Sequence, residues 1–204
     1  MTPRPSSPSP LALLWSVARF TLTESRRNRL PWGVGLLVLM GWALASFLEE
    51  TTLTETVQMQ SALLGAIFRL GGVLLVTATT VAGMAKEQQD RLLELFLALP
   101  MPRFAHFLGK LLGYSLAAWG VALLLGMALL PFVPPMQVLL WSLSLAGELT
   151  LMAALGLLLA LMLAQLPLAL LVAMGFYLLS RSTGALILMA TGPLPGQTSP
   201  LGQL

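Results

Sequence analysis

The side chains with the greatest chemical potential gather in residues 86–110, KEQQDRLLELFLALPMPRFAHFLGK. Within these 25 positions lie three acids, four bases, two glutamines, two prolines and His106, the only histidine of the chain. The chain has no cysteine, so disulfides, thiolate chemistry and cysteine-based metal sites are excluded. One histidine likewise excludes a multi-histidine metal site. Because acids and bases are mixed here, the segment suits a protein partner better than an anionic membrane.

Three further charges, Arg69, Glu148 and Arg181, stand alone inside long apolar runs. Each costs roughly 2.5–3.5 kcal/mol to insert at a bilayer centre, and such groups usually pair with one another. Counted from the ends of their segments, all three lie at a similar depth, so we expect a buried cluster in which Glu148 meets Arg69, Arg181 or both. The cluster is either a structural clamp that fixes helix order, or a site for an anionic head group or a gating charge.

The composition is that of an integral membrane protein. Of 204 residues, 57% are hydrophobic and only 9% are charged, whereas soluble domains carry about 25% charged residues. Alternating barrel strands are absent, so the predicted fold class is all-α, because backbone in lipid must satisfy its own hydrogen bonds. The net charge of +3 is spread along the chain and is interpreted as a topology signal rather than a nucleic-acid surface.

Five segments are long enough to cross a bilayer, which takes about 20 mostly apolar residues. Residues 1–10, which are rich in proline and serine, are expected to form a disordered tail, and residues 11–204 a single transmembrane domain. Pro167 suits the first turn of the last span, where its missing N–H costs nothing. The five predicted spans are residues 30–48, 59–84, 107–130, 137–163 and 168–190.

The loops predict the orientation of the chain. Arginines flank the first span on its N-terminal side, and the charged segment 86–110 carries four bases, whereas EETTLTET after the first span has three glutamates and no base. The excess of Lys and Arg on cytoplasmic loops places the N-terminus and residues 85–106 in the cytoplasm. The expected location is a bacterial inner membrane.

Residues 11–29 precede the first span and have an amphipathic pattern. Leu11, Leu14, Trp15 and Ala18 fall near one face, and the arginines stay polar. This pattern favours a helix lying on the inner leaflet, with its arginines at anionic lipid. The alternative is that the segment simply extends the first span.

The charged segment itself predicts a short amphipathic helix. Leu92, Phe96 and Leu99 recur at helical spacing, and Pro100 and Pro102 end the helix because neither donates a backbone hydrogen bond. The alternative use of such a helix is to rest on lipid. Lipid-resting helices are rich in Lys and Arg, whereas this one has as many acids as bases.

This stretch resembles the cytoplasmic connector of ABC-2-type transporter permeases. The similarity consists of an acidic charged run, a Leu-rich turn (RLLELFLALP), a Pro-x-Arg element (PMPR) and a Gly-Lys that begins the next span (LGKLLGY). VARFTLTESRRNR similarly resembles the interfacial elbow helix of that family. A Gly-Thr common between the acidic run and the Leu-rich turn is replaced here by Gln89-Asp90-Arg91.

The resemblance implies a transport subunit that is not itself an enzyme. Permeases of this family pair with a cytoplasmic ATPase, assemble as dimers of the membrane subunit, and mostly export lipids, polysaccharides, drugs or peptides; the haem-exporter permease of cytochrome maturation has a similar plan. The chain has no G-x-x-x-x-G-K-[ST] loop, so ATP and magnesium would be bound by the partner ATPase. The connector would be the coupling helix that contacts it, through Glu87, Asp90, Arg91, Glu94 and Arg103.

Two alternatives from other classes remain open at this point. One is a non-transporting membrane scaffold or assembly protein, and the other a proton-coupled secondary transporter that uses Glu148 and has helices broken near the midplane. Only Gly71-Gly72 hints at such a break. The family usually has six spans and this chain shows five, so the sixth is truncated, supplied by a partner or lost.

Overall fold

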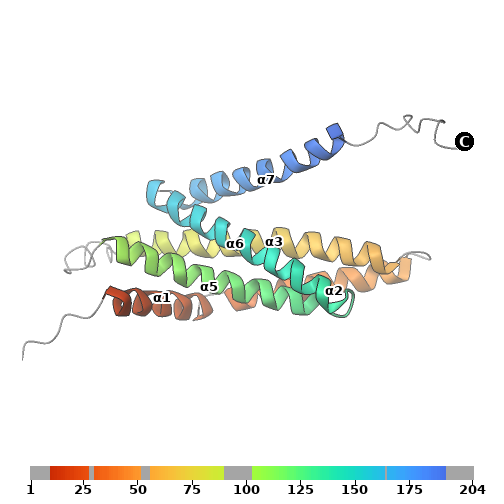
Figure 1. The fold of residues 1–204 in the computed structure, drawn as a ribbon, viewed down its shortest axis with the longest axis horizontal. Helices are drawn as coiled ribbons and strands as arrows, with labels where there is room; N and C mark the ends of the chain where they lie inside the picture. Colours follow the sequence, from red (N-terminus) through yellow and green to blue (C-terminus); the bar gives the residue numbers. More distant parts are fainter. Residues whose placement is uncertain (1–9, 28–29, 52–55, 90–102, 164, 192–204) are drawn as a thin grey trace, which may run out of the picture.

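The computed structural model describes residues 10–27, 30–51, 56–89, 103–163 and 165–191. These residues are helical apart from the short turns between helices, as Figure 1 shows. The predicted tail, residues 1–10, lies outside the described residues except for its last position. The helices are α1 (Pro10–Arg27), α2 (Leu30–Thr51), α3 (Thr56–Gln89), α5 (Arg103–Leu129), α6 (Pro135–Met162) and α7 (Leu166–Thr191).

Five of these helices, α2, α3, α5, α6 and α7, are long and apolar enough to cross a membrane. Each overlaps one of the five predicted spans, so the all-helical membrane architecture is confirmed. Pro135 and Pro167 lie in the first turns of α6 and α7, where a proline needs no hydrogen-bond acceptor. The described ends differ from the predictions by a few residues, most clearly at α3, which continues to Gln89.

The core lies between α3, α5 and α6. Phe68 of α3, Leu125 of α5 and Leu149 of α6 are fully buried. Small residues at the contacts, such as Ala122 and Ala153, let the backbones approach closely, as is usual where van der Waals packing rather than water exclusion joins helices in lipid. This three-helix core positions both ion pairs described below.

Helix α1 lies beside the beginning of α5 and runs in the same direction (Figure 1). Val17 contacts Gly109, and Ala18 and Thr21 contact Gly113, so both helices advance together along the contact. Helix α1 is separate from α2, but it follows α5 rather than crossing it. The interfacial position of residues 11–29 stays a prediction, as does the alternative in which they extend the first span.

Replacing Gly113 with alanine is expected to weaken the docking of α1. A methyl group there would lie 2.6 Å from Cβ of Thr21 and 2.8 Å from the backbone oxygen of Ala18, so the helices must separate. Such overpacking costs about 1–3 kcal/mol, and we expect thermal unfolding in detergent to show that loss. Gly120→Ala is the matched control, since open space surrounds Gly120 on the same helix. If both variants lose the same stability, the loss would come from replacing a glycine within α5 and not from the contact with α1.

Helix α7 lies at the edge of the bundle (Figure 1). Its first half contributes Ala169, Ala173 and Tyr177 to the core. From Leu178 to Gly184 every residue is exposed, which is nearly two full turns of helix without a buried side. Residues 178–184 of α7 are therefore not covered by another helix in the described part of the chain.

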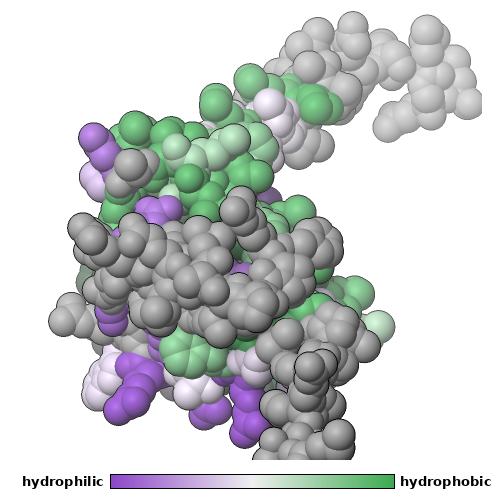
Figure 2. Space-filling model, turned by 90° about the vertical axis from the view of Figure 1, so that its left-hand side faces the viewer, coloured by the Kyte–Doolittle hydropathy of each residue, from purple (hydrophilic) through white to green (hydrophobic). Residues whose placement is uncertain are grey.

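The side of the bundle near α1 is more hydrophilic than the side near α6 and α7. Figure 2 looks at the end of the bundle where α3 stops and α5 starts, and hydrophilic residues gather along its lower edge, at the height of α1 in Figure 1. The upper part of the same view, at the height of α6 and α7, is mostly hydrophobic. The hydrophilic residues in this view therefore lie on the side of the bundle where α1 is found.

Candidate functional site

A charged cluster joins α3, α6 and α7 inside the bundle. Nε of Arg69 lies 3.1 Å from Oε2 of Glu148, although the N–H is not aligned with that oxygen, so the contact is ionic rather than a linear hydrogen bond. Nη2 of Arg69 also donates a hydrogen bond of 3.0 Å to Oγ of Ser144. The guanidinium carbon lies 5.9 Å from the ring centre of Trp141, within the range of a cation–π contact.

The spacing of these partners explains why they meet. Trp141, Ser144 and Glu148 follow one another at intervals of three and four residues on α6, so they share a helix face. That face is turned to α3, where Arg69 projects between them. From α7, the buried Tyr177 lies close enough to Glu148 for its hydroxyl group to interact with that carboxylate.

Of the two predicted partners of Glu148, the structure selects Arg69. Arg181 is exposed, and among the described residues no ion pair within 4.0 Å joins it to Glu148. It lies one turn beyond Tyr177 on α7, close enough to act on that hydroxyl group electrostatically. The predicted three-member cluster is therefore an Arg69–Glu148 pair with Arg181 at its margin.

The surroundings of the pair permit both predicted roles. The side chains of Arg69 and Glu148 are 16% and 21% exposed, so the pair is mostly enclosed but reaches the molecular surface. Helices α3 and α6 are unbroken through this region, including Gly71 and Gly72. The interrupted helices expected of a proton-coupled secondary transporter are absent from these two described helices.

A second ion pair, which sequence reasoning missed, lies at the base of the charged connector. Lys110, near the start of α5, pairs with Glu87, near the end of α3. Both side chains are almost fully buried, at 3% and 6% exposure. Nζ of Lys110 also lies 3.6 Å from Sδ of Met84, one turn back along α3.

A neighbouring hydrogen bond ties the same end of α3 to α6. Nε2 of Gln88 donates to the backbone oxygen of Ala160 at 3.0 Å. Three consecutive helices are thus joined where the connector leaves and re-enters the bundle. Glu87 and Gln88, at the end of α3, therefore hold the helices together, whereas Lys86 beside them is exposed.

The predicted contacts with an ATPase stand as follows. Glu87 belongs to α3 and is buried against Lys110, and its contact with an ATPase stays a prediction. Asp90, Arg91 and Glu94 lie outside the described residues, as does most of the predicted coupling helix. Arg103 is the first residue of α5, and its side chain is not among those described.

Comparison with known proteins does not place this chain in a family. No family model matches it, and no curated protein matches it. What is established is an all-helical chain with five helices capable of crossing a membrane, a mostly enclosed pair between α3 and α6, and a buried pair at the base of the connector.

Proposed function

We propose that the chain is the membrane permease subunit of an ATP-driven exporter of the ABC-2 type. The observation that carries this proposal is the buried Glu87–Lys110 pair, which joins the two helices that flank a charged connector with the sequence features of a coupling helix. ATP hydrolysis, with its magnesium ion, belongs in a separate cytoplasmic subunit. This chain contributes the spans and the surface that receives the motion.

The two contacts at the base of the connector suit the transmission of force. A coupling segment moves spans only if its ends are fixed rigidly to them. Glu87–Lys110 fixes α3 to α5, and Gln88 fixes α3 to α6 at the backbone of Ala160. A displacement of residues 90–102 by an ATPase would therefore be passed to all three core helices together, rather than absorbed by one fraying helix end.

The exposed half of α7 supports a partner within the membrane. Arg181 lies there among other polar residues, and a charged side chain facing lipid is costly. A second copy of this chain or a related permease packed against residues 178–184 would cover it. The described residues contain five candidate spans, and a sixth span supplied by a partner would pack on the same surface.

The polar end of the bundle supports a cytoplasmic N-terminus in a bacterial inner membrane. Lys86, near the end of α3, and Lys110, near the start of α5, lie at the end of the bundle where the connector begins and ends. Basic residues gather on the cytoplasmic side of membrane proteins. Helix α1, which adds Arg19, Arg26 and Arg27, then serves as the elbow before the first span and packs along the start of α5.

The proposal is tested by replacing residues 90–102 with a Gly/Ser linker of equal length in the tagged full chain. Affinity purification from the native host should recover an ATPase with the wild-type chain. The amount of ATPase recovered with the linker variant should be lower by about tenfold or more, equivalent to roughly 1.4 kcal/mol of binding energy. Thermal unfolding of the linker variant checks that the bundle is intact. Recovery of the same ATPase at the same level by both chains would reject the coupling role of the connector.

A further inference from the structure

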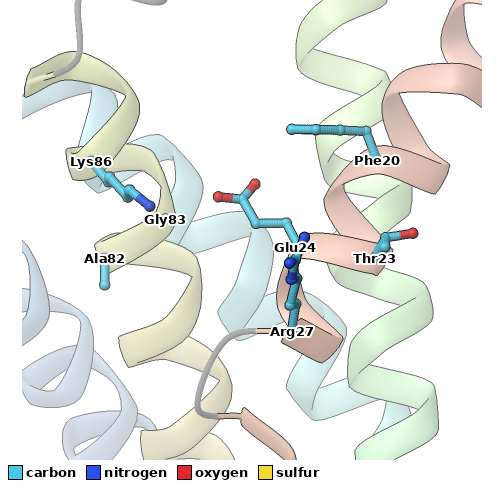
Figure 3. A pocket seen from close by; sticks show the side chains of 7 residues that line it. All are labelled: Phe20, Thr23, Glu24, Arg27, Ala82, Gly83 and Lys86. Atoms are coloured by element: carbon cyan, nitrogen blue, oxygen red, sulfur yellow. The ribbon is translucent and has the colours of Figure 1, made fainter.

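A cavity opens between the second half of α1 and the end of α3. Its volume is about 520 Å³, which is within the usual range for small-molecule sites. Figure 3 shows its lining, with α1 on one side and α3 on the other. The lining residues are Phe20, Thr23, Glu24, Arg27, Ala82, Gly83 and Lys86.

Three charged side chains from the two helices face this cavity. Lys86 extends from α3 and Glu24 from α1 toward the same gap, and Arg27 lies beside Glu24 one turn on (Figure 3). Within the described part of the chain, no ion pair within 4.0 Å joins any two of them. Two cationic groups and one carboxylate therefore keep their hydrogen-bonding capacity for a ligand.

The position of the cavity along the bundle corresponds to the headgroup level of a bilayer. The apolar window of α3 runs from Gln60 to Gln88, so Lys86 lies at its end. Arg27 precedes the apolar window of α2, which begins at Leu30. Phe20, which is 63% exposed, also lines the cavity and offers it an apolar surface.

We propose that this cavity binds the headgroup of an aminophospholipid, a phosphodiester that carries a primary ammonium group. Lys86 and Arg27 bind the phosphate oxygens through charge-assisted hydrogen bonds, from opposite sides of the cavity. Glu24, placed between them, accepts hydrogen bonds from the ammonium group. The acyl chains leave along the apolar surface below, and the lipid thereby joins α1 to α3.

Glu24 is the residue that decides between ligands of related chemistry. A purely anionic group, such as inorganic phosphate or an anionic lipid headgroup, would be attracted by the two cations but repelled by the carboxylate. A zwitterionic headgroup with a free ammonium group satisfies all three charges. A trimethylated ammonium group carries the same charge but has no N–H to donate, so its lipid should bind more weakly.

The test is native mass spectrometry of the full chain after reconstitution into nanodiscs of equal parts phosphatidylethanolamine, phosphatidylglycerol and phosphatidylcholine. We expect retained phosphatidylethanolamine on the wild-type chain and about tenfold less on the double variant Arg27→Gln, Lys86→Gln. Glu24→Gln should remove the preference for phosphatidylethanolamine and leave phosphatidylglycerol bound. Arg26→Gln, an exposed arginine next to the cavity residues but outside the lining, is the matched control and should behave as wild type.

Three results would overturn the assignment. The first is an equal loss of lipid in Arg26→Gln and the double variant, because a diffuse basic surface would then be responsible. The second is equal retention of the three lipids by the wild-type chain. The third is displacement of the lipid by free phosphoethanolamine, which would make the ligand a soluble phosphate ester. The site does not depend on an ATPase, so its failure would leave the proposed transport function untouched.

Discussion

Replacing Lys110 with methionine is expected to lower the free energy of unfolding by about 3–5 kcal/mol, the cost of a buried charge whose partner has been removed. Methionine keeps the length and apolar stem of lysine, so the loss reflects the charge of Glu87 left in a site where it is only 6% exposed. Denaturation of the purified chain in detergent, followed by circular dichroism, measures the change.

Two variants separate the ion pair from simpler effects. Adding Glu87→Gln to Lys110→Met should restore most of the stability, because neither side chain is then charged and unpaired. Arg26→Met, at an exposed arginine near the end of α1, should change stability by no more than about 0.5 kcal/mol. If the single Lys110→Met variant is as stable as the wild type, the Glu87–Lys110 pair does not stabilise the fold as proposed.

The second large effect is expected at the intramembrane pair. Glu148→Gln leaves Arg69 without its acidic partner inside the bundle, and we expect a loss of about 2.5–3.5 kcal/mol, the cost of an isolated charge at that depth. The hydrogen bond from Arg69 to Ser144 remains and moderates the loss. Unfolding in lipid nanodiscs, where the bilayer cost is present, is the appropriate measurement.

The swapped variant Arg69→Glu, Glu148→Arg distinguishes a clamp from a substrate site. A clamp needs only opposite charges, so the swap should recover much of the stability and also the ATPase activity of the proposed exporter complex. A site for an anionic head group needs the arginine where it is, so stability would recover and activity would not. If the Glu148→Gln variant is as stable and as active as the wild type, the hypothesis of a structural clamp is wrong.

The membrane architecture could be predicted because hydropathy over 20 residues is a strong and local signal. All five candidate spans were found in this way. The ends were less accurate for a physical reason that is visible at α3. The predicted span stopped at residue 84, before the polar Lys86, Glu87 and Gln88, whereas the helix continues because two of these residues have partners on α5 and α6.

The pairing of Glu148 with an arginine was predictable from depth, but the choice of arginine was not. Residue counting places Arg69 and Arg181 at the same level, whereas contact depends on the rotation of each helix about its axis. The described structure turns Arg69 toward α6 and leaves Arg181 exposed on α7. Tertiary packing, which a single sequence does not encode in any short pattern, decides between them.

The Glu87–Lys110 pair was missed because a charge near a helix end is ordinarily expected to reach water. No short pattern in the sequence marks this pair, since Gly109 and Gly113 of the same helix mark instead the face that α1 covers so closely that a side chain would clash. The direction of α1 was likewise not readable from its amphipathic pattern. A leaflet surface and a neighbouring helix both bind an apolar face.

The most direct test of the coupling proposal is site-specific crosslinking from the connector. Because the chain has no native cysteine, single cysteines at Asp90 and Glu94 carry a photocrosslinker without background. Leu130→Cys, exposed at the turn between α5 and α6 at the other end of the bundle, is the control. Capture of an ATPase with a nucleotide-binding loop from Asp90 and Glu94 but not from Leu130 is the predicted result. Capture of lipid alone, or of a protein that is not an ATPase, from both connector positions would contradict it.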